Sequence, residues 1–417
     1  MLDDALVLFV LILEASLALL LLYLEGLMKK PWVTVLCSVL VALAFAARAG
    51  VFDYETLDYQ NFLTRWVSFF WENGGFRALQ YSVGNYNIPY LYFLAFFSYL
   101  PTRDLYLIKL FSVLFDVLLA WASMKLVGRV TDKPVLRLGS FFAVLFWPTV
   151  FLNGSLWGQC DSIYVAFALL GIWLALENKP SASMVMMTLS FAFKLQAVFV
   201  LPICAVLWFA KKYKWQHFLL FPLTYLLLVL PAVLLGRPLW DTISLYWNQT
   251  GSIGSGLNYN SPSIFAILWK IPESQQKNAS TVGIVAAALY MLNLLAIAYV
   301  KRSKLTDRAI LALALLFSIG IPFLLPHMHD RYFFPADILS LVLAFAYLPV
   351  FLVAPLVEFA SLLGYHAYLK MRYLLYMYYG AYALIAAMAL ALLVFACSLK
   401  EPAPPTKKKP KPKKKTT

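Results

Sequence analysis

An acidic segment follows the second apolar run of the sequence. Asp53, Glu55 and Asp58 fall within six residues of one another, with aromatic side chains between and after them. A carboxylate at the edge of a membrane can take a proton from an attacking hydroxyl, which is the task of a general base. The same residues could instead be an interfacial set that faces water beside an aromatic belt.

A second polar segment runs from residue 153 to residue 162 and opens a new helix. It contains Trp157, Gln159 and Asp161 together with two glycines. A polar, closely packed turn with an indole ring beside an amide is suited to binding a sugar. Asp161 and Ser162 are also residues that commonly start helices, so a helix cap explains them as well.

A lysine, Lys194, stands inside an apolar run and is followed by Gln196. A lysine at the centre of a membrane helix costs about 2.5–3.5 kcal/mol on insertion scales, so it needs a reason to be there. It could bind the phosphate of a substrate if the surrounding hairpin turns at the outer face. The other interpretation is a side chain that extends to the membrane surface.

The most specific short segment is Pro326-His-Met-His-Asp-Arg-Tyr332. His327 and His329 are two of the four histidines in the chain, and Arg331 follows them. Histidine and arginine donate hydrogen bonds to phosphate oxygens, and arginine can do so with two nitrogens. The two histidines could also bind a metal ion with Asp330 as a third ligand, or the segment could be an ordinary loop.

One apolar run carries two charged residues, Lys109 and Asp116. Seven residues of helix separate them by about 10.5 Å along one face. They could line a cavity, but pairing with neighbouring helices is the favoured interpretation.

The composition predicts that membrane-spanning helices position these residues. Of the 417 residues, 62% are hydrophobic and 13% are charged, against about 25% charged in a typical soluble domain. Apolar runs of span length recur along the chain without the alternation of barrel strands. We therefore expect an all-α, polytopic bundle of about thirteen helices, near residues 5–23, 32–50, 105–125, 136–152, 162–177, 181–195, 196–210, 215–235, 280–300, 308–325, 333–347, 349–365 and 374–397.

The distribution of lysine and arginine predicts the threading. Basic clusters near residues 29–30, 125–137, 211–214 and 301–308 mark cytoplasmic loops. The segments 51–104, 153–161, 236–279 and 326–332 then share the outer face, and these contain the unusual polar residues. The apolar stretch 90–100 is too short to span and is expected to be an interfacial or re-entrant helix.

We predict a single membrane domain over residues 1–400, with outer loop 51–104, and a tail over residues 401–417. The tail holds seven lysines among prolines. A disordered cytoplasmic tail that helps to fix topology is the favoured interpretation, over a tether for nucleic acid or lipid headgroups. No nucleic-acid partner is expected.

These residues, in this order, resemble the GT-C superfamily of membrane glycosyltransferases, whose donors are polyprenyl-phosphate sugars. The likeness is strongest to bacterial relatives of the second mannosyltransferase of GPI-anchor synthesis and covers about residues 30–340. The His-x-His segment also resembles that of dolichyl-phosphate-glucose glucosyltransferases, which leaves the sugar open. The matching stretches are Asp58-Tyr59 with Phe62 and Trp66, Trp157 to Tyr164, Phe193 to Gln196 with Pro202, and His327 to Pro335.

The resemblance implies inverting transfer of a hexose, most readily mannose, to a lipid-linked or cell-envelope acceptor on the extracytoplasmic face of a bacterial plasma membrane. It implies no bound metal, and we expect no cofactor. Asp58 is the expected general base, Asp53 and Glu55 are the runners-up for that role, and Asp161 is a further catalytic candidate. Lys194, His327, His329 and Arg331 are expected to bind the donor phosphate. The expected substrate-binding residues are Glu55, Trp157, Gln159, Gln196 and Asn258.

Two other functions compete with this interpretation. A transporter or flippase of a lipid-linked sugar would thread polar residues through its helices and show a pseudo-repeat, whereas this chain gathers polar residues at one face. A structural subunit of an envelope assembly would leave the acidic loop and the His-x-His segment unexplained.

Overall fold

The computed structural model describes residues 2–251 and 256–400, so the expected tail at 401–417 lies outside the described residues. The described part is built from helices and one pair of two-residue strands. Its first helices are α1 Leu2–Leu24, α2 Pro31–Ala49, α3 Thr64–Glu72, α4 Ile88–Phe97, α5 Asp104–Val130, α6 Pro134–Phe146, α7 Pro148–Phe151, α8 Asp161–Leu176 and α9 Pro180–Phe193. Its later elements are α10 Ile203–Phe209, α11 Leu220–Leu234, α12 Leu239–Gly251, β1 Asn258–Tyr259, α13 Ile264–Ile267, α14 Gln276–Val300, α15 Asp307–Leu324, β2 Met328–His329, α16 Phe334–Ala346, α17 Val353–Leu369 and α18 Met377–Ser398.

The all-α prediction is confirmed, and each of the thirteen expected segments has a helical counterpart within a few residues. By length and composition, eight of the described helices could each cross a membrane, or nine spans result if the bent pair α6 and α7 is counted as one. The bend of 45° falls at Pro148, because proline removes a backbone donor and clashes with the preceding turn. The shorter helices α8, α9 and α16 are apolar and lie largely inside the bundle.

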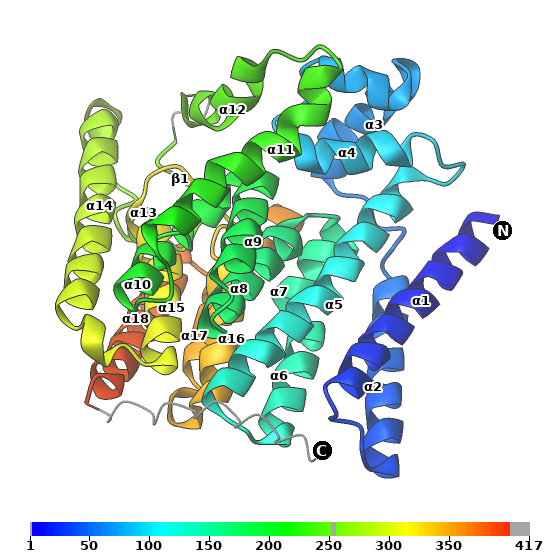
Figure 1. Cartoon of the computed structure of the whole chain (residues 1–417). Coiled ribbons are helices and arrows are strands. Elements are labelled where there is room, and N and C mark those ends of the chain that lie inside the picture. The colour runs from blue at the N-terminus through cyan, green and yellow to red at the C-terminus, as the bar shows by residue number, and fades with distance from the viewer. Residues whose placement is uncertain (1, 252–255, 401–417) are drawn as a thin grey trace.

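The bundle is organised around α15, which is buried along most of its length and packs against α14, α16 and α18. Helices α5 and α8 form a second packed layer with α9. The α1–α2 pair lies at one flank and α14 at the other (Figure 1). These flanking helices expose rows of Leu, Ile and Val side chains, which a bilayer can solvate and water cannot.

Ion pairs join three of the four loops predicted to be cytoplasmic at one end of the bundle. Glu25, after α1, contacts Lys125 and Arg137 at 2.7 Å each, so it joins the α1–α2 loop to the α5–α6 connection. Arg129 contacts Glu177 at 2.7 Å and Asp307 at 2.8 Å, which joins that connection to two more loops. The shared end is therefore as expected from the basic clusters, while its cytoplasmic orientation stays a prediction.

Lys109 and Asp116 of α5 have structural partners, as favoured from the sequence. Asp116 accepts a hydrogen bond from Ser162 at 2.6 Å and forms a buried ion pair with Arg48 of α2 at 3.1 Å. The ammonium of Lys109 donates to the carbonyl oxygens of Val51, Phe52 and Tyr54 at 2.7–3.0 Å. Lys109 thus holds in place the loop that leads from α2 to the acidic segment.

The long segment between α2 and α5 folds over the other end of the bundle as α3 and α4 (Figure 1). The apolar stretch expected to be interfacial is helix α4, which packs against α3, α9 and α11. Its Tyr92 donates to the Leu228 carbonyl at 2.7 Å, and Asn87 caps its first turn. The prediction of a helix is confirmed here, and its depth in a membrane stays an expectation.

Candidate active site

Asp58 lies at the centre of a hydrogen-bond network at the α3–α4 end of the bundle. Its Oδ2 accepts hydrogen bonds from Trp157 Nε1 at 2.9 Å and Gln159 Nε2 at 2.8 Å. Its Oδ1 accepts one from the Tyr368 hydroxyl at 2.7 Å. A carboxylate oxygen has two acceptor positions, so Oδ1 retains capacity for a further proton donor.

Backbone geometry brings the two polar segments together. Asp58 directly precedes a π-helical turn, Tyr59–Leu63, and another π-helical turn, Leu152–Trp157, leads to Gly158. Gly158 has a φ of 77°, which glycine adopts without steric cost. Thr56 Oγ1 donates to the Trp157 carbonyl at 3.3 Å and ties the two segments to each other. Such π turns are rare and often occur at functional sites.

The indole of Trp157 is a fully buried platform beneath this network. One neighbour is the ring of Tyr368, stacked at 4.2 Å between centroids with an angle of 10°. The guanidinium carbon of Arg331 lies 5.1 Å from the indole centroid, within the range of a cation–π interaction. Trp157 therefore orients both Asp58 and Arg331 through contacts that need no substrate.

Arg331 lies between two carboxylates. Its Nη1 is 3.5 Å from Asp58 Oδ2, and its Nε is 3.6 Å from Asp161 Oδ2. Burial alone would lower the pKa of the guanidinium, but Asp161, Tyr86 and further acidic groups outweigh burial and raise it. Arg331 is therefore a permanent positive charge, and its longer contacts leave N–H groups available to an anion.

Asp161 is more enclosed than Asp58. Lys194 Nζ contacts its Oδ1 at 2.5 Å, and Asn153 Nδ2 donates to its Oδ2 at 2.8 Å. Asn153 also donates to the Tyr365 hydroxyl at 2.8 Å. The buried charge of Lys194 is thus balanced inside the protein, and the lysine does not extend to the surface.

The two histidines of the His-x-His segment have different surroundings. β1 and β2 pair in parallel, with Tyr259 opposite His329, and these two rings stack at 4.8 Å. His327 instead contacts the Gly256 carbonyl at 2.7 Å and Ser280 Oγ at 3.2 Å through its two ring nitrogens. Its φ of 62° turns the chain here. His327 therefore anchors the loop, and His329 is presented beside Arg331.

Titration in this loop is strongly perturbed. Burial, followed by the positive charge of Arg331, lowers the pKa of His329 to about 4. Burial raises the pKa of the Asp330 carboxyl to about 7, although Arg331 opposes the change. Near neutral pH His329 is an uncharged imidazole that can donate one hydrogen bond, and Asp330 is partly protonated.

His329, Asp330 and Arg331 line a cavity of about 410 Å³. Of the predicted site residues, Asp58, Gln159, His329 and Arg331 line it. Trp157 and Asp161 lie behind that wall, through their contacts with Asp58 and Arg331. The remaining lining is largely aromatic and includes Phe62, Trp66, Tyr86, Tyr259, Tyr332 and Tyr368.

The other predicted residues do not line this cavity. Asp53 accepts a hydrogen bond from Tyr106 at 2.6 Å, and Glu55 pairs with Arg103 and Gln60. Asn258 closes a turn with the backbone of Ser261 and lines a second cavity. A further member of the predicted set, Gln196, is hydrogen-bonded to Tyr332.

Sequence reasoning missed several residues of the site. Tyr368 is at the end of α17, far from any polar motif, and only its contact with Asp58 reveals it. Gly364, one turn earlier, lets two loops approach α17: an added Cβ would lie 2.7 Å from the Asp330 carbonyl oxygen and 2.8 Å from that of Asn260. In the sequence these two residues are simply a glycine and a tyrosine in an apolar run, and no motif marks either of them.

Comparison with known proteins adds one finding. Residues 97–210, from the end of α4 to α10, match the N-terminal domain model of the alpha-(1->6)-mannopyranosyltransferase family MptA/B. This segment contains Trp157, Gln159, Asp161 and Lys194. Comparison with curated proteins gives no match. The match covers 114 of the 417 residues, so over this segment the chain is similar to the membrane mannosyltransferases of that family.

Proposed function

We propose that the chain transfers mannose from a polyprenyl-phosphate donor to a hydroxyl of a lipid-linked or cell-envelope acceptor, with inversion, on the extracytoplasmic face. The observation that carries the proposal is the juxtaposition of Asp58 and Arg331, 3.5 Å apart on one cavity wall. A base and a cation that line one cavity can serve the two ends of one displacement, since the base can contact the attacking hydroxyl and the cation the leaving phosphate.

In this reaction the acceptor oxygen bonds to C1 of the donor sugar as the C1–O bond to phosphate breaks. The acceptor proton passes to Asp58, whose Oδ1 has an acceptor position left beside Tyr368. The leaving polyprenyl phosphate gains one negative charge. Arg331 and the neutral N–H of His329 can stabilise that charge in place, since both line the same cavity.

The other expected phosphate ligands support the site from behind. Lys194 is already paired with Asp161, and His327 is held by the loop backbone and Ser280. We therefore assign direct contact with the phosphate to Arg331 and His329. Lys194 contributes through Asp161, because this pair fixes the carboxylate beside the Arg331 Nε.

The test is transfer by the purified full chain in lipid nanodiscs, with labelled polyprenyl-phosphate mannose and a mannoside acceptor. We expect labelled product from the lipid donor and none from a soluble nucleotide sugar. Efficient use of the nucleotide sugar would refute the lipid-donor assignment. Movement of the lipid-linked sugar across a vesicle membrane without transfer would favour a flippase.

Orientation is tested by cysteine labelling in intact cells. The exposed residues Glu72, in α3, and Lys301, at the end of α14, lie at the two ends expected to be outside and inside. In a Cys397→Ser background, which removes the exposed native thiol, we expect Glu72→Cys to react with an impermeant reagent and Lys301→Cys to react after permeabilisation. The reverse result would contradict an extracytoplasmic site.

A further inference from the structure

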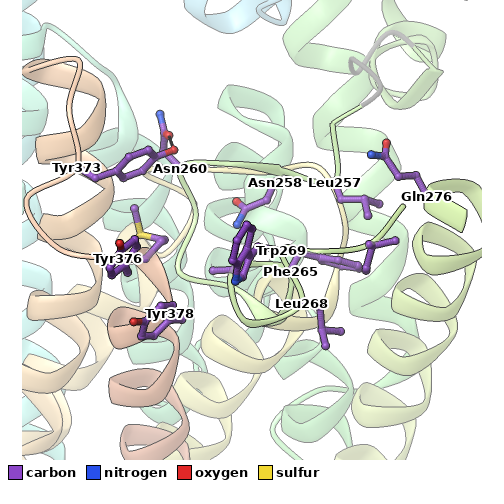
Figure 2. Close-up of a pocket in the computed structure, with 13 residues that line it drawn as sticks. Leu257, Asn258, Asn260, Phe265, Leu268, Trp269, Gln276, Tyr373, Tyr376 and Tyr378 are labelled. Atoms are coloured by element: carbon purple, nitrogen blue, oxygen red, sulfur yellow. Dashed lines mark hydrogen bonds between the residues drawn. The ribbon is translucent and has the colours of Figure 1, made fainter. Parts of the chain in front are cut away.

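Figure 2 shows a second cavity, of about 760 Å³, which has one lining residue in common with the first. It lies where the loop between β1 and α14 meets the beginning of α18. Asn260 lines both cavities, and its Oδ1 accepts a hydrogen bond from Tyr373 at 2.6 Å. The two spaces are therefore neighbours with a shared wall.

Strand β1 forms part of that wall. Successive side chains of a strand point to opposite faces. Accordingly Asn258 lines the second cavity, whereas Tyr259 lines the first and stacks on His329. A ligand in the second cavity thus lies one strand away from the residues assigned to the reaction.

The lining of the second cavity has the chemistry that carbohydrates select. Trp269, Tyr373, Tyr376 and Tyr378 supply aromatic rings, as Figure 2 shows. Trp269 is 67% exposed and Tyr376 is 69% exposed, so the protein core does not cover these rings and a ligand can reach them. Sugar rings present C–H groups that pack on aromatic faces and hydroxyls that hydrogen-bond to their edges.

Three amides complete the lining: Asn258, Asn260 and Gln276. Asn258 already bonds the backbone of Ser261, and Asn260 Oδ1 already accepts from Tyr373. An amide has two N–H donors and two acceptor positions, so each of the two keeps capacity for a sugar hydroxyl. A pocket that is mostly aromatic with a few polar groups is the usual form of a ligand site, and about 300–1,000 Å³ is its usual size. A purely interfacial aromatic belt has no need of three amides around one cavity.

A third cavity, of about 430 Å³, lies beyond Phe265, Leu268 and Ile271, which line both it and the second cavity. Its remaining lining is mainly aliphatic, with Val282, Ala286 and Leu324. A lipid chain suits this aliphatic third cavity better than the second one. The aromatic and amide lining of the second cavity therefore favours a sugar there.

We propose that the second cavity is an acceptor subsite that holds sugar residues already present on the acceptor. The enzyme would then extend a glycan chain and favour long acceptors over a single mannoside. The inference rests on the proposed transfer reaction for its biological meaning, but the binding of glycan to this cavity is measurable without it.

The first test is calorimetric binding of α-(1→6)-linked mannotetraose to the full chain in nanodiscs, in the Asp58→Asn background and without donor. We expect Trp269→Ala and Tyr376→Ala each to weaken binding by about tenfold or more, since each removes an aromatic contact. The control is Trp71→Ala, since Trp71 in α3 is 72% exposed and lines neither this cavity nor the first.

The second test is activity. The two substitutions should raise KM for the tetrasaccharide acceptor while leaving the donor KM and the use of a methyl mannoside unchanged. Equal binding by the wild type and both variants, or equal losses on short and long acceptors, would overturn the subsite. Displacement of the tetrasaccharide by a sugar-free polyprenyl phosphate would instead make the cavity a lipid groove. Binding without transfer would count against the reaction and leave the subsite standing.

Discussion

Two aspartates flank Arg331, and their surroundings differ. The side chain of Asp58 is 20% exposed and accepts hydrogen bonds from uncharged donors at the wall of the cavity. The side chain of Asp161 is 2% exposed and is paired with the Lys194 ammonium. The carboxylate of Asp58 can therefore contact a substrate, whereas the carboxylate of Asp161 is already paired within the protein.

The resemblance suggested Asp58 as the general base, and this difference gives a physical reason to rank it above Asp161. Asp58, Asp53 and Asp161 are all acidic residues of the expected outer face, and composition alone does not rank them. Solvent access and existing partners rank them. A general base must reach a substrate hydroxyl. A carboxylate in a buried ion pair is unsuited to that role, because breaking the pair costs too much free energy. We therefore propose that Asp161 positions Arg331.

The largest effect is expected for Asp58→Asn. The amide keeps the shape of the carboxylate but cannot take the acceptor proton, so kcat should fall by about 10²–10⁴-fold. Binding of the lipid donor and thermal stability should stay near the wild-type values. Radiolabel transfer and donor titration measure both.

The matched control is Asp53→Asn, since Asp53 is in the same loop but contacts Tyr106 outside the cavity. This variant should transfer mannose at close to the wild-type rate. If Asp53→Asn is inactive and Asp58→Asn is active, the roles of the two residues are reversed.

Asp161→Asn should act mainly on stability. It leaves the Lys194 ammonium buried without a compensating charge, which costs about 3–5 kcal/mol. Denaturant unfolding of the purified chain in detergent measures the loss. Asp58→Asn, compared in the same assay, should unfold like the wild type.

A double variant sharpens this comparison. Lys194→Met with Asp161→Asn removes both charges, so its loss of stability should be smaller than the sum of the two single losses. Additive losses would mean that the contact at 2.5 Å between the two residues does not couple them.

Tyr368→Phe should lower kcat by less than Asp58→Asn does, because it removes one hydrogen bond to Asp58. It removes the hydrogen bond to Oδ1 but keeps the ring stacked on Trp157. Loss of one hydrogen bond to a charged group is about 1.5 kcal/mol, or about tenfold in kcat. Steady-state kinetics with Tyr382→Phe, an exposed tyrosine of α18, as the control would detect it; an unchanged kcat would remove Tyr368 from the site.

The smallest effect concerns Asp330, the second carboxyl that lines the cavity beside Asp58. Its folded pKa of about 7 lies above its ordinary value of 3.8, so between these pH values the folded chain holds the proton more tightly than the unfolded chain. The free energy of unfolding from this group therefore falls as pH rises from about 4 to about 7.

Asp330→Asn resembles the protonated form at every pH. Its melting temperature relative to the wild type should accordingly rise as pH increases over that range. His329 acts in the opposite sense, because its pKa is lowered to about 4 and its contribution is lost as pH falls from 6.5. A difference between Asp330→Asn and the wild type that does not vary with pH would contradict the shifted pKa.

The helices could be predicted from the sequence because a segment that crosses a bilayer must be apolar and must satisfy its own backbone hydrogen bonds. A run such as Asp104–Val130 must be apolar to cross lipid and helical to satisfy its own backbone. Basic loops mark one end of the bundle, so the polar segments around Asp58, Gln159 and His329 could be assigned to the other end. Both inferences follow from local composition.

The division of labour within the site required the tertiary structure. Whether Lys194 meets a phosphate, a headgroup or Asp161 depends on how α8 and α9 pack, and no local pattern encodes that distance. Tyr368 contacts Asp58 across 310 positions of sequence, and Gly364 matters only because two loops press on α17. Partners, burial and access are properties of contacts between distant segments, and these decide which aspartate is open to a substrate.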